Sequence, residues 1–259
     1  MAELSERQVE ITERLREEGF LAVEALADHY SVTTQTIRRD LTTLCDHGLA
    51  RRRHGGIERP GGAGNLAYVS RQILARSAKQ AIAREVARHI PDYASVAFGI
   101  GTTPEVVATA LLHHKGLRIF TNNLNVAMLA CSNPSFEVNI AGGRIRNSDY
   151  DVLGPDIETF LSSYMFDFGI YGVAGVSEQG TLLDFYDEEV RARRLIHDNS
   201  RENFLVLDHG KFGRSAHVRG GQIGEASKVF CDARPPGRIV EALQESGSQL
   251  VICAEDKTE

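Results

Sequence analysis

Ser31-Val32-Thr33-Thr34-Gln35-Thr36-Ile37-Arg38-Arg39-Asp40-Leu41-Thr42-Thr43-Leu44 decides the fold of the first part of the chain. Thr33 is placed to cap a helix, because its hydroxyl can accept an amide proton that the first helical turn leaves without a partner. Ile37, Leu41 and Leu44 follow at helical spacing and form one apolar stripe. The segment therefore predicts an amphipathic helix that begins at Thr34.

The side chains that point away from this stripe are polar or basic. At 100° per residue, the outer face holds Gln35, Arg38, Arg39 and Thr42. An amide, two guanidiniums and a hydroxyl match the base edges of a DNA major groove and the phosphates beside it. Such a face is also typical of an ordinary solvated helix, so the neighbouring segments must decide between the two.

Those neighbours favour a winged helix-turn-helix. A short helix is predicted by the spacing of Val23, Leu26, Ala27 and Tyr30 and ends near Tyr30. Only two residues separate it from Thr33, which is the short turn of a helix-turn-helix. Leu4, Ile11 and Leu15 mark an earlier helix, which Gly19 ends. The basic run Arg51-Arg52-Arg53-His54-Gly55-Gly56 resembles a strand that enters a wing hairpin. The DNA-binding residues predicted on this basis are Thr34, Gln35, Thr36, Arg38, Arg39, Thr42, Arg51, Arg52, Arg53 and His54.

Charge supports this interpretation by region, although the whole chain has a net charge of −6. Residues 1–30 hold 3 basic and 8 acidic side chains, which gives −5, while residues 31–60 hold 6 basic and 3 acidic ones, which gives +3. Positive charge is thus confined to the predicted recognition helix and wing. This asymmetry orients the module on a double-stranded DNA operator without making the whole protein bind nucleic acid.

The length of 259 residues suits two domains. We expect a DNA-binding domain over residues 1–57, a linker over 58–75 and a second domain over 76–259. Pro60-Gly61-Gly62-Ala63-Gly64-Asn65 is too rich in glycine for a helix or strand. Tyr68 to Arg76 either continues this linker or begins a helix, and a helix resumes at Lys79.

Composition indicates a cytoplasmic protein. No signal peptide opens the chain, and no segment approaches the roughly 20 apolar residues of a membrane helix. Cys45, Cys131, Cys231 and Cys253 form no C-x-x-C pair, which argues against zinc and against a disulfide framework. We expect buried free thiols, no metal, no cofactor and no contact with a membrane.

The second domain alternates short apolar runs with helical stretches. This pattern predicts an α/β domain with a mainly parallel sheet covered on both faces. The expected strands are Ser95–Ile100, Leu117–Phe120, Phe136–Ile140, Phe168–Tyr171, Phe204–Leu207, Val229–Cys231 and Leu250–Cys253. The expected helices are Pro104–His113, Leu124–Ala130, Asp187–Asn199 and Pro236–Ser246.

Ligands of such sheets bind beyond the carboxyl ends of the strands. The loop Gly101-Thr102-Thr103 leads into a helix with Pro104 expected at its first position, and amides at a helix start suit a phosphate. Asn122 and Asn123 add side-chain donors, and Lys211 adds a cation in a glycine-flanked loop. The predicted effector-binding residues are Gly101, Thr102, Thr103, Asn122, Asn123, Gly143 and Lys211. Each segment is also compatible with an ordinary turn, and their convergence favours a phosphorylated ligand.

With both halves considered, the chain resembles the DeoR family of bacterial transcriptional repressors over nearly its full length. The resemblance is carried by long motifs: Val32–Leu41, Arg53-His54-Gly55-Gly56, Ile100–Glu105, Thr121–Ala127 and Asp208–Arg214. It implies a sensor domain similar to sugar-phosphate isomerases. It also implies repression of a carbon-catabolism operon, relieved by a small phosphorylated polyol or sugar, with glycerol 3-phosphate as the leading candidate. The segment Arg144–Asp151 departs from the pattern, and another polyol or sugar would suit the pocket if this segment lines it.

Two other functions are compatible with parts of the sequence. An isomerase-like enzyme would use Asp184, Asp187, Glu188 and Glu189, since paired carboxylates suit enediol chemistry. Asp187-Glu188-Glu189 also opens a helix, however, where acidic side chains simply complement the helix dipole. A protein–protein module would leave the basic helix face unexplained. We therefore expect a repressor without catalytic residues, acting as a homo-oligomer, dimer or tetramer.

Overall fold

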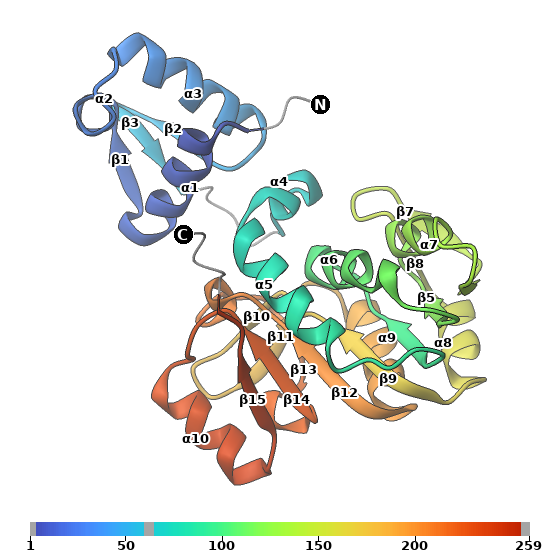
Figure 1. Cartoon of the computed structure of the whole chain (residues 1–259). Coiled ribbons are helices and arrows are strands. Elements are labelled where there is room, and N and C mark those ends of the chain that lie inside the picture. Colours follow the sequence, from blue (N-terminus) through green and yellow to red (C-terminus); the bar gives the residue numbers. More distant parts are fainter. Residues whose placement is uncertain (1–3, 60–64, 255–259) are drawn as a thin grey trace. The chain divides into compact units, whose positions relative to one another are not determined.

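The computed structural model describes residues 4–59 and 65–254 (Figure 1). The chain divides into two compact units, Met1–Arg76 and Ser77–Glu259. Each unit has hydrophobic core clusters of its own.

The first unit contains the predicted winged helix-turn-helix. Leu26 of α2 and Ile37 and Leu44 of α3 are buried together with the apolar side chains of α1, and burial of one such side chain contributes about 1.5–3 kcal/mol. The sequence did not predict β1, which pairs with β3 and makes the wing a three-stranded antiparallel sheet of order β1-β3-β2. The helices are α1 (Glu6–Glu18), α2 (Val23–His29) and α3 (Thr34–Asp46), and the strands are β1 (Phe20–Ala22), β2 (Arg51–Arg53) and β3 (Gly56–Glu58).

Two parts of the expected linker, residues 58–75, have regular secondary structure. Glu58 belongs to β3, and Tyr68–Ile73 form helix α4. Leu74 is part of the core of the first unit, and the Ser70 hydroxyl donates to the backbone carbonyl of His47. The apolar side chains of this segment pack against the core of the first unit. Residues 60–64 lie outside the described residues.

The second unit is built on one seven-stranded parallel sheet, and all seven predicted strands belong to it. The strand order is β15-β14-β12-β9-β4-β5-β6, and every pairing in this sheet is parallel. Continuous apolar runs predicted these strands correctly because both faces of the sheet are covered. The strands are β4 (Ser95–Phe98), β5 (Arg118–Thr121), β6 (Glu137–Ile140), β9 (Phe166–Tyr171), β12 (Ser200–Val206), β14 (Lys228–Cys231) and β15 (Gln249–Ile252).

Helices cover the two faces of this sheet and form separate cores. Alternate residues of β4 show the division, since Val96 and Phe98 face one core and Ala97 faces the other. The first face is packed by α5 (Arg76–Ala87), α6 (Thr102–Ala110) and α7 (Leu124–Ala130). The second face is packed by α8 (Pro155–Ser162), α9 (Asp187–Asp198) and α10 (Gly237–Ser246).

Several elements of the second unit were not predicted. They are the antiparallel hairpin of β7 (Arg144–Arg146) and β8 (Asp151–Leu153), helix α8, and a second sheet of β10 (Gly175–Val176), β11 (Thr181–Asp184) and β13 (Val218–Gln222). The β7–β8 hairpin contains the segment that departs from the DeoR pattern. These strands are only two to five residues long, and glycines or charged residues interrupt their apolar residues, so they lack the longer apolar runs that mark the main sheet.

The strand order places a topological switch point beside β4. The chain proceeds from β4 to β5 and β6 on one side, and then crosses to β9 on the other side of β4. The connections that leave β4 and β9 therefore diverge and open a crevice at the carboxyl ends of these two strands.

The cysteines are only partly as expected. Cys231 and Cys253 are buried, whereas Cys45 is half-buried and Cys131 is exposed. Cys131 directly follows α7, where the side chain lies beyond the apolar face of the helix. Within residues 4–59 and 65–254, no helix is long and apolar enough to cross a membrane, and no group of three His, Cys, Asp or Glu side chains is placed to hold a metal ion.

Candidate functional site

Helix α3 presents the polar face that the sequence predicted. The Thr33 hydroxyl caps the helix by accepting from the amide of Thr36 at 3.2 Å, and the two threonine hydroxyls lie 3.0 Å apart. The exposed residues along its first turns are Thr34, Gln35, Arg38 and Arg39. The apolar stripe on the opposite side is buried, so the helix is anchored through one face and leaves the other available to a partner.

Asp40 fixes the orientation of α3 from its buried side. Its carboxylate accepts from Arg7 Nε and from Gln8 Nε2, each at 2.8 Å, and both partners belong to α1. The side chain is almost fully buried, although it lies only one or two residues from the exposed arginines. Because its charge is paired with Arg7, Asp40 supports the recognition helix rather than repelling phosphate from it.

The wing places three further arginines beside α3. Arg51, Arg52 and Arg53 of β2 are all exposed, as is His54 in the turn that follows. Arg51 and Arg53 form ion pairs with Glu58 of β3, at 2.9 and 3.5 Å. Arg52 donates to the hydroxyl of the half-buried Thr42, which connects the wing to the recognition helix. The structure thus brings the predicted DNA-binding residues of α3 and β2 onto adjoining surfaces.

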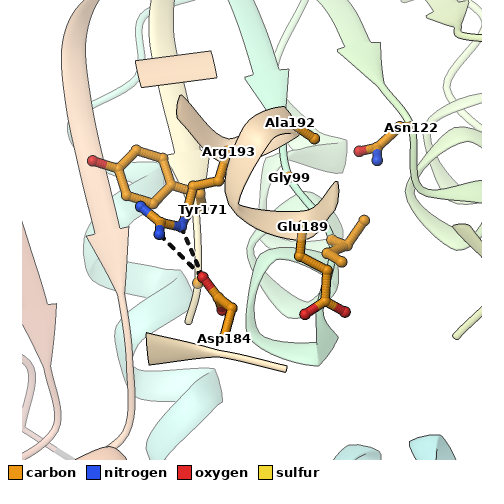
Figure 2. Close-up of a pocket in the computed structure, with 9 residues that line it drawn as sticks. Gly99, Asn122, Tyr171, Asp184, Glu189, Ala192 and Arg193 are labelled. Atoms are coloured by element: carbon orange, nitrogen blue, oxygen red, sulfur yellow. Dashed lines mark hydrogen bonds and ion pairs between the residues drawn. The ribbon is translucent and has the colours of Figure 1, made fainter. Parts of the chain in front are cut away.

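The second unit has a pocket at the switch point (Figure 2). Strand ends supply Gly99, Ile100, Asn122, Tyr171, Gly172 and Asp184, and α9 supplies Glu189, Ala192 and Arg193. The pocket measures about 280 Å³ including its open mouth.

An ion pair between Arg193 and Asp184 forms one wall of the pocket (Figure 2). Arg193 donates twice to Asp184 Oδ2, at 3.2 and 3.0 Å, and once to the backbone oxygen of Gly220 at 2.9 Å. The second carboxyl oxygen of Asp184 accepts from the amide of Ala174 at 3.0 Å. Asp184 is therefore held as a paired carboxylate rather than placed to transfer protons.

A second arginine holds the other acidic wall from outside the pocket. Arg146 of β7 makes a bidentate contact with Asp151, at 3.0 and 2.7 Å, and donates to Glu189 at 2.7 Å. Its guanidinium also lies 4.9 Å from the ring centroid of Tyr186. Burial raises the pKa of Asp151 and of Glu189, and the charge and hydrogen bonds of Arg146 oppose this rise.

The predicted effector residues occupy different places around this pocket. Asn122 lines it. Gly101, Thr102 and Thr103 are not among the lining residues, but they follow directly after Gly99 and Ile100, which are. Gly101 has φ +119° and caps α6, so Pro104 is the third helical residue and not the first. The proline still loses no hydrogen bond there, because the first four amides of a helix have no partner within it.

Three other predicted residues lie outside the lining. The Asn123 side chain accepts from the amides of Asn125 and Val126, at 2.9 and 3.3 Å, and donates to Glu105 at 2.8 Å, so it is engaged within the protein. Gly143 is exposed before β7, with φ +141°. Lys211 is half-buried in the short 3-10 helix η2 (His209–Lys211), which follows the carboxyl end of β12.

Comparison with known proteins accounts for both units. Residues 7–61 match the DeoR-like helix-turn-helix domain, and residues 75–233 match the DeoR C terminal sensor domain. The chain belongs to the DeoR family. The glycerol-3-phosphate regulon repressor of Escherichia coli K12 is 41% identical over 96% of this chain and 99% of its own length. The repressor of the same name from Haemophilus influenzae is 43% identical over 95% of this chain and 96% of its own length.

Solved structures resemble the DeoR sensor domain much less closely. Ribose 5-phosphate isomerase A from Methanocaldococcus jannaschii is 15% identical, with a TM-score of 0.40 over 53% of this chain and 55% of that chain. This likeness concerns the fold alone.

Sequence reasoning missed two arginines of this DeoR sensor domain. Arg193 was detectable, because Glu189 and Arg193 are four residues apart and lie on the same face of α9 as the buried Ala192 and Ile196. Arg146 was not detectable from the sequence. It is 43 residues from Glu189, and only the β7–β8 hairpin brings the two side chains together.

We expect the Arg146→Met substitution to lower the free energy of unfolding by about 3 kcal/mol at pH 7, because it leaves buried carboxylates without their cation. Asp151 and Glu189 already have raised pKa values, and protonation removes their uncompensated charge. The deficit should therefore shrink as pH falls through those values. Urea unfolding at pH 7 and pH 5 measures both effects.

Arg191→Met is the matched control for that substitution. Arg191 is on the same helix as Glu189 and pairs with Glu158 and Asp187, but its side chain is 51% exposed. An exposed pair contributes about 0–1 kcal/mol, so this variant should remain close to wild type. Equal losses in the two variants, or a deficit of Arg146→Met that does not change with pH, would contradict the assignment.

Proposed function

We propose that this protein is a transcriptional repressor that leaves its operator DNA when a small phosphorylated polyol binds the sensor domain. The observation that carries the proposal is the exposed face of α3, with Gln35, Arg38 and Arg39 beside the exposed arginines of β2. In this arrangement α3 enters the major groove and the wing contacts the phosphate backbone. The protein would act in the cytoplasm, where bacterial operator DNA is found.

The two sets of arginines have different roles in this docking. Arg38 and Arg39 project from a helix that is rigidly packed, so they can make bidentate contacts with guanine edges. Arg51, Arg52 and Arg53 lie on a strand and would neutralise phosphates, together with His54. Thr34 supplies an exposed hydroxyl on the same helix, while the hydroxyl of Thr36 lies against that of Thr33 and the hydroxyl of Thr42 accepts from Arg52.

We expect Arg38→Ala or Arg39→Ala to weaken operator binding by about 1–3 kcal/mol and to relax specificity at one base pair. Arg52→Ala should instead weaken binding to all sequences alike and reduce the salt slope by about one unit. Fluorescence anisotropy with operator and scrambled DNA, at several salt concentrations, separates the two effects.

Arg201→Ala is the control, since Arg201 is an exposed arginine in the sensor domain that pairs with Asp167. It should leave affinity and salt dependence unchanged. Wild-type binding by all three α3 and β2 variants would rule out this docking.

We place the phosphate of the effector at the start of α6. The amides of a first helical turn point out of the helix end, where an anion is favoured, and Thr102 and Thr103 add hydroxyls. Lys211 supplies a cation from the same edge of the sheet. Gly101 and Gly143 keep backbone near this edge free of side chains. Since relatives at 41 and 43% identity are named for a glycerol-3-phosphate regulon, we propose glycerol 3-phosphate as the effector.

We also propose that the ligand leaves the pocket chemically unchanged. Three of the four acids named for an isomerase-like reaction are engaged, and in two of these pairs Asp184 meets Arg193 and Glu189 meets Arg146. Asp187, at the exposed start of α9, pairs with Arg191 at 2.9 Å. These contacts favour a binding site over a catalytic one.

We expect Lys211→Glu and Thr102→Glu to yield repressors that bind operator normally but ignore glycerol 3-phosphate, because each places a negative charge beside the phosphate. In the wild type, coupling of about 1–3 kcal/mol corresponds to a 5–150-fold loss of operator affinity on effector binding. Operator binding is measured with and without glycerol 3-phosphate, and thermal unfolding verifies that each variant is folded.

Lys115→Glu is the control, because the exposed Lys115 precedes β5 and so lies at the opposite edge of the sheet. This variant should respond like the wild type. If Lys211→Glu and Thr102→Glu respond at wild-type concentrations, the pocket is misplaced. If no phosphorylated polyol or sugar moves the wild type off its operator, the proposed function is wrong.

We further propose that the protein acts as a homo-oligomer, at least a dimer. A single small module contacts roughly 600–1,000 Å² of DNA, which is little for tight operator binding. Two modules on half-sites one or more helical turns apart gain affinity through their effective concentration. Light scattering should give a mass of two or four chains, and a monomer that binds an unrepeated site tightly would contradict this.

A further inference from the structure

Asn122 has a buried amide oxygen without a partner. The residue follows β5 and is 1% exposed. Its Nδ2 donates to the backbone oxygen of Val152 at 3.0 Å. A carbonyl oxygen can only accept, so this contact determines which end of the Asn122 amide is nitrogen and which is oxygen. Its Oδ1 has no hydrogen-bond donor among the residues that the structure describes.

Asn122 is one of three lining residues that carry side-chain carbonyl or carboxylate acceptor atoms. Asn122 lines the pocket together with Asp184 and Glu189 (Figure 2). The cations near these carboxylates are turned toward them, since Arg193 donates to Asp184 and Arg146 donates to Glu189. Ligand atoms that meet the side chains of Asn122, Asp184 and Glu189 must therefore bring hydrogen-bond donors.

The part of the pocket next to the start of α6 offers donors instead of acceptors. Gly99 and Ile100 lead into the start of α6, where backbone amides favour an anion. A small ligand that spans both parts of the pocket must carry an anionic group at the end near α6 and hydroxyl groups at the end near Asn122. A carbonyl group against Asn122 would instead bring two acceptor oxygens together.

We propose that Asn122 determines effector specificity: its amide oxygen accepts a hydrogen bond from one hydroxyl of the effector, so that a phosphorylated polyol is bound and an analogue without that hydroxyl is rejected. This inference rests on the proposed function, because it assumes that the phosphate occupies the start of α6. It adds the chemical group that the other end of the ligand must carry, and the residue that recognises it.

The test compares three ligands by calorimetry with the full-length protein. They are glycerol 3-phosphate, propane-1,2-diol 1-phosphate, which lacks the terminal hydroxyl, and propane-1,3-diol monophosphate, which lacks the middle one. One of the two deoxy analogues should bind the wild type at least tenfold more weakly than glycerol 3-phosphate. In Asn122→Ala this difference should fall to less than about threefold, because the oxygen that reads the hydroxyl is gone.

Asn203→Ala is a closely matched control. Asn203 is also buried, and its Oδ1 also has no donor among the described residues, but it lies on β12 and does not line the pocket. This variant should retain the wild-type discrimination. Thermal unfolding of both variants separates a loss of recognition from a loss of fold.

The results distinguish this inference from the proposed function. If the wild type binds all three ligands equally, Asn122 does not select a hydroxyl, and this result requires no variant. Unchanged discrimination in a folded Asn122→Ala would overturn the inference in the same way, while the response to glycerol 3-phosphate would still support the repressor. If neither glycerol 3-phosphate nor its analogues bind, the proposed effector itself is wrong.

Discussion

The pairing of β4 with β9 is the contact on which the second unit depends. These strands are neighbours in the sheet, although the chain forms β5 and β6 between them. Asp167 of β9 holds their register, since its carboxylate accepts from the amide and the hydroxyl of Ser95, at 2.9 and 2.7 Å. These hydrogen bonds lower the pKa of Asp167. A shift in this register would move Tyr171 and Gly99 apart, and the pocket that they line would be lost.

In the first unit, helix α3 carries charged side chains on two sides: some face solvent and one faces the core. Arg38, Arg39 and Asp40 are consecutive, yet the arginines are exposed and the aspartate is buried against α1. Arg7, one of the three basic residues in the acidic segment 1–30, is thus used inside the unit, where it holds α3 in place through Asp40. A helix that is fixed through its apolar stripe and through Asp40 loses little conformational freedom when it binds DNA.

The sequence alone predicts those elements that carry their own apolar signal, either a continuous apolar run or a helical apolar stripe. The seven parallel strands and the helix-turn-helix are of this kind. Of the strand-end residues, Gly99, Ile100 and Asn122 line the pocket. The second sheet was missed because β10, β11 and β13 are short and contain glycines or charged residues. The sequence left open whether α4 is a helix or part of the linker, because the preceding segment is glycine-rich and the apolar surface against which the helix packs comes from elsewhere in the unit.

The β7–β8 hairpin has a consequence for how sensors of this type diversify. It is not part of the main sheet, and it contacts the pocket region through Arg146 and the backbone of Val152. Changes within the hairpin therefore leave the register of the parallel strands and the start of α6 intact. In the proposed site, exchange of a few residues in this one peripheral hairpin would alter which metabolite is sensed, while the phosphate end at α6 would stay the same.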